Sequence, residues 1–352
     1  MKRILTLRSV VCVLLLTGFG LSTETVNGQF RIELDDGRWI QVGGGIRSTF
    51  RAAEQPDGSY TNDVSLDNTR LYFNAQPHES FLVEMNTEYI GSTSEIKVLD
   101  AVAKFGPNES FNVWAGRHLP PSDRANLDGP FFLSAYEYPG LVSRYPAIFA
   151  GRDDGVSVSG QVEGGVFKYA VGMYKGIPQA VGQDGSSLFA ARFTYNFLDP
   201  EPGYYTSSSY YGDKDILAVA FVIQFQREAI AGPTNAFQDF RGYNFDILFE
   251  RPLSNAGVIS LEGAYYNYDY GAASGGGNAY LAQAGYLIPA EVGPGKFQPM
   301  VRFQEFEGDS IVDAGVNYII RGHNARLSLM YSKIESKANN LGRFTLGSQF
   351  QF

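Results

Sequence analysis

The chain has 352 residues, 14% of them aromatic, and a formal net charge of −9. This acidic balance argues against nucleic acid as a partner, because phosphate binding needs a basic surface. The single cysteine, Cys12, rules out a disulfide framework and a cysteine-based metal site. Beyond the N-terminal segment there is no run of about 18 apolar residues, so no transmembrane helix is expected.

Residues 1–28 have the pattern of a secretory signal peptide. Three basic residues precede an apolar run over 10–16, and Val-Asn-Gly at 26–28 supplies a small-residue cleavage site. The run is too short to cross a bilayer as a helix; the alternative is a buried N-terminal strand or helix. Because this segment carries three basic residues and one acid, residues 29–352 have a formal charge of −11.

From residue 40 onward, apolar and polar residues alternate with a period of two, which is typical of strands with one face in lipid and one in water. The first runs cover 40–51, 70–75, 81–89, 96–105 and 111–116, and the fourth has no clear phase. Later runs cover 155–161, 166–174, 188–197, 216–226, 242–251, 257–267, 279–288, 296–306, 311–321, 324–334 and 343–352. These runs predict that 29–352 form an all-β fold, a transmembrane antiparallel β-barrel of about sixteen strands.

Connections between the runs alternate in length in places, as periplasmic turns and external loops do. Short turns are expected at 76–79, 162–165 and 322–323, and longer loops at 52–63, 175–187, 227–237 and 269–277. The polar stretch 198–215 does not fit, because it falls where a short turn is expected. Two soluble folds are the alternatives. One β-sandwich normally uses fewer strands, and the chain lacks the short repeat of a β-helix.

The stretch 117–152 is a long irregular segment rich in Pro, Gly and aromatic residues. A connection of this length in a compact chain is usually functional or disordered, and its aromatics argue against disorder. It follows the fifth strand, so we expect it to be a third external loop that folds inward and narrows the bore. The candidate constriction residues are Arg117, Arg124, Arg144, Arg152, Asp123, Asp128 and Glu137. We expect Arg124 and Arg144 to face the pore and Arg117 and Arg152 to anchor the loop.

The phase of the alternation turns residues of both charges toward the lumen. The predicted lumen-wall residues are Arg47, Arg51, Arg70, Lys168, Arg192, Arg302, Arg326, Glu84, Asp246, Glu262 and Asp313, with Glu88, Asp100 and Glu250 on the same side. A mixed wall gives a transverse field that orients polar solutes, whereas a ring of one sign selects ions. Any single one of these residues is more simply explained as the polar lining of a water-filled barrel.

No catalytic or metal-binding constellation stands out, and no cofactor is implied. The three histidines, His78, His118 and His323, are scattered over a loop and two turns, where surface positions are expected. An outer-membrane barrel enzyme would need a nucleophile, a base and an orienting group, and the sequence offers no such set. A plugged structural or adhesin barrel would show long external loops and paired lumenal charges.

Three short motifs surround the long segment: GRHLP at 116–120, RDDGVSVSG at 152–160 and FKYAVGMYKG at 167–176. Together they resemble the phosphate-selective porin O and P family, in which Asn is usual at the position of Lys175. The resemblance implies a sixteen-stranded barrel, usually trimeric, whose third external loop forms the constriction. It also implies a preference for anions such as phosphate, carried by lumenal Arg and Lys.

The last run, 343–352, ends in Phe352 and places aromatic residues on one face. It resembles the C-terminal signal of Gram-negative outer-membrane proteins, which implies the barrel-assembly machinery as a partner. Aromatic rings on the outward face suit the membrane interface. The sequence therefore predicts an outer-membrane porin, in contact with lipid, for passive diffusion of small hydrophilic solutes or ions, including anions, with no enzymatic activity.

Overall fold

The computed structural model describes residues 25–26, 29–90, 93–177, 186–201, 203–232, 236–254 and 256–352. The predicted signal peptide lies outside these residues, except for the short strand β1 (Thr25–Val26). No helix within these ranges is long and apolar enough to span a membrane.

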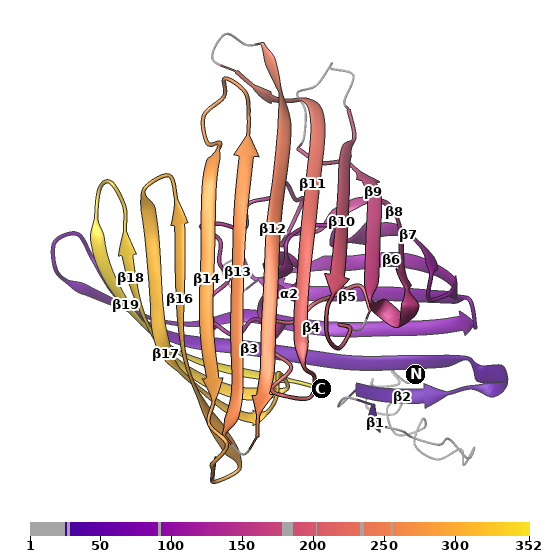
Figure 1. Cartoon of the computed structure of the whole chain (residues 1–352), viewed down its shortest axis with the longest axis horizontal. Coiled ribbons are helices and arrows are strands. Elements are labelled where there is room, and N and C mark those ends of the chain that lie inside the picture. Colours follow the sequence, from indigo (N-terminus) through magenta and orange to yellow (C-terminus); the bar gives the residue numbers. More distant parts are fainter. Residues whose placement is uncertain are drawn as a thin grey trace, which may run out of the picture.

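Sixteen long strands in the described ranges form one closed antiparallel ring (Figure 1). They are β3 (Trp39–Glu54), β4 (Tyr60–His78), β5 (Phe81–Ile90), β6 (Glu95–Asn108), β7 (Phe111–His118), β8 (Asp153–Val162), β9 (Phe167–Tyr174), β10 (Leu188–Asn196), β11 (Ile216–Ala231), β12 (Phe237–Leu253), β13 (Gly257–Asp269), β14 (Gly277–Leu287), β16 (Gly295–Phe306), β17 (Asp309–Arg321), β18 (Ala325–Glu335) and β19 (Asn340–Gln351). Each pairs with its sequence neighbours among these sixteen, and β19 pairs with β3 to close the ring. Two shorter strands are β2 (Gln29–Glu33) and β15 (Glu291–Val292). The predicted barrel is confirmed.

Side chains along the strands alternate between exposed apolar and buried polar residues, as the sequence predicts. In β18, Leu329 is 52% exposed whereas Arg326 is fully buried. A polar interior with an apolar exterior is the reverse of a soluble fold and suits a barrel in lipid. The unclear phase of the fourth run has a local cause, a bulge in β6. Leu99 has no partner in β5, so Leu99 and Asp100 are both buried.

The described ends of the chain meet on the same edge of β3. Strand β2 pairs with the first residues of β3, and β19 pairs with the residues that follow. At the junction, Gly44 and Phe352 exchange two backbone hydrogen bonds of 2.9 Å. The two terminal segments therefore lie end to end and complete the ring.

Connections alternate between two ends of the ring, because successive strands are antiparallel. The end that holds Phe352, here called the terminal mouth, also carries the β10–β11 and β17–β18 connections. The other end, the opposite mouth, carries the β3–β4 and β7–β8 connections. The β3–β4 loop is shorter than the predicted 52–63, because both strands continue through these residues to Glu54 and from Tyr60.

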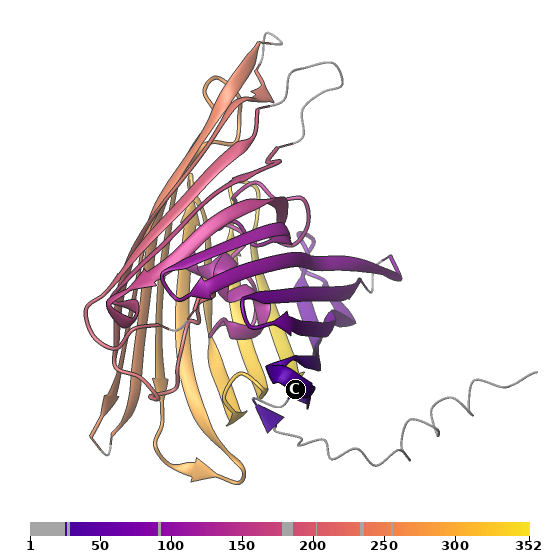
Figure 2. The same ribbon diagram turned by 90° about the vertical axis from the view of Figure 1, so that its right-hand side faces the viewer.

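Two long connections have buried residues. The β7–β8 segment (residues 119–152) contains helix α2 (Arg124–Phe132), which is distorted at Gly129, where φ is 57°. The β10–β11 segment (described residues 197–201 and 203–215) leaves the ring at the terminal mouth. In Figures 1 and 2, α2 lies at the level of the strands rather than beyond their ends.

Candidate pore constriction

Backbone carbonyls of the β7–β8 segment accept hydrogen bonds from one part of the ring. The donors belong to strands β16 to β19. They are Gln349 to Phe131 (2.8 Å), Arg326 to Leu133 (2.5 Å), Asn317 to Ser134 (2.9 Å) and Arg302 to Glu137 (2.7 Å). Arg47 on β3 donates to the carbonyl of Tyr136, and its guanidinium lies 4.0 Å from that ring. The stretch 131–137 is thus fixed through its backbone, which no side-chain pattern encodes.

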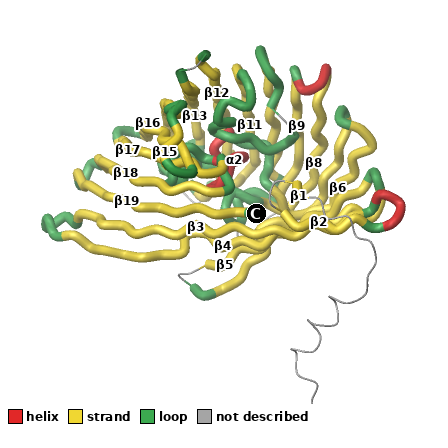
Figure 3. The backbone as a smooth tube through the Cα atoms, turned by 90° about the horizontal axis from the view of Figure 1, so that it is seen from below, coloured by secondary structure: helices red, strands yellow, loops and turns green. Residues whose placement is uncertain are grey.

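Other residues of the β7–β8 segment contact strands β10 to β13. Arg192 and Gln224 donate to the carbonyls of Ser122 and Pro121, at 3.0 and 2.8 Å. The hydroxyl of Tyr268 donates to the carbonyl of Val142 at 2.7 Å. Figure 3 shows α2 in the view from below the ring. The contacted strands extend around more than half of the ring.

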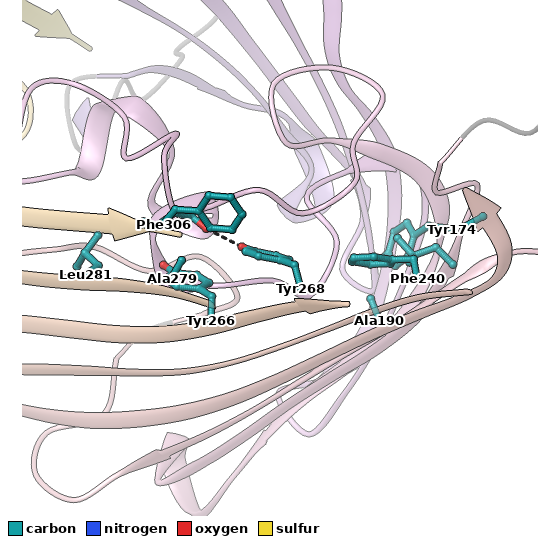
Figure 4. Packing of buried hydrophobic residues seen from close by; sticks show 11 residues of the cluster. Tyr174, Ala190, Phe240, Tyr266, Tyr268, Ala279, Leu281 and Phe306 are labelled. Atoms are coloured by element: carbon teal, nitrogen blue, oxygen red, sulfur yellow. Dashed lines mark hydrogen bonds between the residues drawn. The ribbon is translucent and has the colours of Figure 1, made fainter. Parts of the chain in front are cut away.

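A cluster of buried apolar and tyrosine residues lies between the β7–β8 segment and the strands near the opposite mouth. Figure 4 shows Tyr268 at its centre, with Phe306 on one side and Phe240 on the other, and a dashed line marks the hydrogen bond that the Tyr268 hydroxyl donates. The buried members are Val142, Tyr174, Leu188, Ala190, Ala229, Phe240, Tyr266, Tyr268, Ala279, Leu281 and Phe306. Burying apolar and aromatic surface here stabilises the position of residues 141–145.

Arg124 is 1% exposed, so the expectation that it faces the pore is wrong. Its guanidinium forms a bidentate pair with Glu201 of the β10–β11 segment, at 2.6 and 2.7 Å. Asp246 on β12 lies 3.7 Å from the Nε atom of Arg124 and pairs with Arg192 at 2.6 Å. Burial alone would raise the pKa of Glu201, but the charge and hydrogen bonds of Arg124 outweigh it and lower the pKa to about 2. The sequence could not reveal this partner, which is 77 residues away.

The other three constriction arginines have different surroundings. Arg152 pairs with Asp100 at 3.1 Å, and Arg117, which belongs to β7, pairs with Asp154 at 2.7 Å. Arg144 is exposed, with its guanidinium 4.2 Å from the ring of Phe306, and no carboxylate in the described ranges forms an ion pair with it.

The three acids predicted in this region also differ. Glu137 pairs with Arg51 at 2.9 Å. Asp123 accepts hydrogen bonds from Ser143 at 2.9 Å and Tyr266 at 3.0 Å. Burial, followed by the negative charge of nearby Asp246, raises the pKa of Asp123 to about 6, although its hydrogen bonds act in the opposite direction.

Asp128 is buried, and its Oδ2 atom accepts a hydrogen bond of 2.8 Å from Ser208. Its Oδ1 atom has no hydrogen-bond partner among the described residues. Asp128 therefore presents an unused acceptor at the contact between the two long connections.

Most predicted lumen-wall cations have a carboxylate partner. The pairs are Arg51–Asp67 (2.8 Å), Arg70–Glu88 (2.9 Å), Arg192–Asp246 (2.6 Å) and Arg302–Asp313 (2.8 Å). The predicted wall acid Glu84 pairs with Lys104 of β6 at 2.6 Å. Lys168, Arg47 and Arg326 instead donate to carbonyl oxygens, and Glu262 accepts from Gln283 at 3.2 Å. Within the described ranges, the predicted wall cations therefore do not form a row of unpaired positive charges.

The β10–β11 segment contributes residues that the sequence-based prediction missed. Its three consecutive serines, Ser207 to Ser209, are buried, and Ser209 donates to Glu250 on β12 at 2.7 Å. The only signal was the unexplained length of the 198–215 stretch. Its residues have no strand alternation, so their partners were not predictable.

One of the three histidines, His118, is not the surface residue that was expected, and His323 is half-buried. His118 is buried and hydrogen-bonded to Ser157 and Tyr174, at 3.0 and 2.9 Å. His323 contacts Ser207 at 2.9 Å. No group of three or more metal-binding side chains that could hold an ion occurs in the described part of the chain.

A cavity of about 770 Å³ remains beside the two long connections. On one side it is lined by Arg70, Tyr72, Asn74, Glu84, Asn86 and Asp100 from β4, β5 and β6. On the other side lie Asp128 and Phe131 of α2 together with Tyr205 and Ser207. Arg321 and Phe352 line it at the terminal mouth.

The closed antiparallel ring with a lipid-compatible outer face is the architecture of the general outer-membrane porins. Among solved structures, an anion-selective porin from Comamonas acidovorans is similar over 90% of this chain and 100% of its own, with a TM-score of 0.63 and 13% identity. OmpF of Salmonella typhi matches over 91% of this chain and 99% of its own, with a TM-score of 0.59 and 12% identity. OmpT of Vibrio cholerae, an outer membrane protein, matches over 91% and 99%, with a TM-score of 0.57 and 13% identity.

No protein-family model matches the chain, and no curated protein matches its sequence. At these identities the structural likeness shows a shared porin fold.

Proposed function

We propose that this protein is an outer-membrane porin for the passive diffusion of small hydrophilic solutes or ions, and that it has no enzymatic activity. The observation that carries the proposal is the closed ring with an apolar exterior and a polar interior that contains a cavity of about 770 Å³. The similar solved structures include an anion-selective porin and an outer membrane protein, which supports a location in the outer membrane of a Gram-negative bacterium.

The β7–β8 segment is proposed to be the third external loop and the element that narrows the pore. Its hydrogen bonds to β10–β13, to β16–β19 and to β3 support this role. A wide ring leaves a bore that side chains alone do not fill. No carboxylate of the described residues pairs with the exposed Arg144, which is the proposed cation of the pore surface near the opposite mouth, beside Phe306.

A strong preference for phosphate or other anions is not part of the proposal. One similar structure is named an anion-selective porin, which favours some anion permeability. The pairing of Arg70, Arg152, Arg192 and Arg302 with carboxylates argues for weak selectivity. Selectivity by charge needs an uncompensated ring of one sign.

Liposome swelling tests the proposed function. Vesicles containing the purified barrel should admit small sugars and salts and exclude large polysaccharides, whereas vesicles with heat-unfolded protein should not swell. Absence of swelling with a correctly folded barrel would remove the porin proposal. Lipase and protease assays on the same preparation should give no turnover.

A plugged structural barrel is the second candidate. The paired interior charges and the buried core of the β7–β8 segment favour it over an enzyme. A plugged barrel would leave both salts and sugars outside the vesicles while keeping its heat-resistant folded form. The swelling assay therefore separates the two candidates.

Assembly is proposed to follow the pattern of similar porins, as a homotrimer embedded in outer-membrane lipid. One solved structure of OmpT from Vibrio cholerae is described as a trimer form. Recognition by the barrel-assembly machinery is proposed to use the last strand and Phe352, whose side chain is 61% exposed.

A further inference from the structure

The β10–β11 segment meets the β7–β8 segment although the two connections leave the ring at opposite mouths. The backbone N–H of Ser208 donates to the carbonyl of Phe132 at 3.0 Å. The hydroxyl of Ser208 donates to Asp128 at 2.8 Å, and the hydroxyl of Tyr204 donates to the carbonyl of Leu119 at 2.8 Å. Contacts of this kind require the β10–β11 segment to turn back from its mouth into the ring.

A buried ionic cluster fixes this meeting point. Arg124 binds Glu201 through two hydrogen bonds and the carbonyl of Ser207 through a third of 3.1 Å. Asp246 and Arg192 tie the same cluster to β12 and β10. A bidentate pair between fully buried groups is geometrically restrictive, and loss of either partner unbalances the charge of the buried cluster.

The β10–β11 segment is also held against the wall beside it. Glu250 on β12 accepts hydrogen bonds from the hydroxyl of Ser209 and from the backbone N–H groups of Tyr210 and Gly212, at 2.7, 2.9 and 3.0 Å. Lys168 on β9 donates to the carbonyl of Glu201 at 3.3 Å. The segment is therefore attached to the β9–β12 side of the ring, across the cavity from β4–β6.

We propose that the β10–β11 segment is a second constriction element, and that the two segments together confine the passage to the side of the lumen lined by β4, β5 and β6. The Arg124–Glu201 pair is the latch between them. The inference rests on the proposed pore function and specifies which part of the lumen solutes pass through. The passage is lined by Arg70, whose guanidinium pairs with Glu88, by the pair Arg152–Asp100, and by amide and hydroxyl groups. Solutes are therefore contacted mainly through hydrogen bonds.

The first test shortens the second element. Replacing residues 203–209 with a Gly-Ser-Gly turn should raise single-channel conductance about twofold or more, because a wider bore conducts more ions. Equal conductance of the shortened and the full-length protein would overturn the proposal, and so would the absence of conductance in both. If only the shortened variant conducts, the second constriction is supported while the proposed function of the full chain as an open porin fails.

The second test places a bulky residue in the passage. Asn74→Trp, on the cavity side of β4, should lower conductance by about half or more, because the ring would occupy the passage. Leu71→Trp, on the outer face of the same strand, where the side chain is 64% exposed, is the matched control and should conduct like the unmodified protein. Equal conductance of the two variants would place the passage elsewhere and overturn the proposal.

A third test is independent of conduction. Phe132→Cys combined with Ser208→Cys, in a protein lacking Cys12, should form a disulfide in the folded barrel, because the two backbones are joined by a hydrogen bond of 3.0 Å. Phe132→Cys alone and Ser208→Cys alone should form none. Failure of the pair to cross-link in a correctly folded barrel would show that the segments do not meet.

The latch itself is tested by a double-mutant cycle. Glu201→Gln removes the bidentate partner of Arg124, which keeps the 3.7 Å contact with Asp246, and should increase open-channel current noise several-fold. Arg124→Gln with Glu201→Gln should restore a quieter channel, because the excess buried positive charge is then removed. Arg241→Gln, in an exposed pair with Asp239, is the control. Equal noise in the single and double variants would overturn the assignment of the latch.

Discussion

The burial of Arg124 shows why the role of a single charged residue depends on its partners. An arginine in a water-filled pore needs no counter-ion, but one removed from water needs a carboxylate or carbonyl oxygens. Arg124 has Glu201, whereas Arg144 lies exposed beside Phe306. The sequence presents both as arginines in the same loop, and only their surroundings distinguish a structural pair from a candidate selectivity residue.

Arg144→Ala is predicted to shift ion selectivity without affecting folding. Removing an exposed cation from the pore surface should lower the anion-to-cation permeability ratio by about twofold, because the local potential becomes less positive. The reversal potential in a salt gradient measures the ratio. Arg241→Ala, at an exposed site paired with Asp239, is the control and should leave it unchanged. An unchanged ratio in the Arg144 variant would remove it from the pore surface.

Deprotonation of Asp123 is predicted to lower the free energy of unfolding as pH rises. Its folded pKa of about 6 exceeds the ordinary value of 3.8, so the folded state binds the proton more tightly. The stabilisation is complete below pH 4 and is lost as pH rises through 6. Asp123→Asn should remove this dependence and be more stable than the unmodified protein at pH 7 by about 1–2 kcal/mol. Thermal unfolding between pH 4 and 8 provides the measurement. A pH profile with the same slope in both proteins would contradict the assignment.

At the scale of elements, the strands and the two long connections follow different rules. Each strand is specified locally, because alternation places apolar residues outside and polar residues inside. The stretch 131–137 is instead held by donors from β3 and β16 to β19 that reach its carbonyl groups. The connections therefore depend on the completed ring for their conformation.

Asp313→Asn is predicted to destabilise the wall next to the β7–β8 segment. Asp313 pairs with Arg302, which donates to the carbonyl of Glu137. Losing the carboxylate charge leaves a buried guanidinium uncompensated, at a cost of about 3–5 kcal/mol in the free energy of unfolding. Urea unfolding in detergent measures the loss. Asp239→Asn, in an exposed pair, should cost less than about 1 kcal/mol. Equal losses would show that the Arg302 pair is not structurally important.

For the whole molecule, the balance of the interior charges determines the field in the lumen more than the net charge does. Acids and bases are interspersed, and most of the predicted wall cations are neutralised within 4 Å. The field inside is therefore made of local dipoles rather than one potential of a single sign.

The unmodified protein is therefore predicted to discriminate only weakly between anions and cations. In a tenfold potassium chloride gradient, the permeability ratio should lie within about threefold of unity. Raising the salt concentration should change this ratio little, because buried and paired charges are screened weakly. A ratio above about ten in favour of anions would contradict this local compensation of charge and would point to an exposed cation such as Arg144.

The sequence by itself determined the ring: the strand runs, their antiparallel order, the outward apolar face and the position of the long β7–β8 segment between the fifth and sixth strands. These features follow from a local period of two and from connection lengths. The tertiary structure decided that Arg124 binds Glu201, that Arg326 donates to backbone carbonyls and that residues 197–215 meet α2. Such contacts join residues many positions apart and obey no period, so burial and hydrogen-bond geometry select them only once the ring has closed.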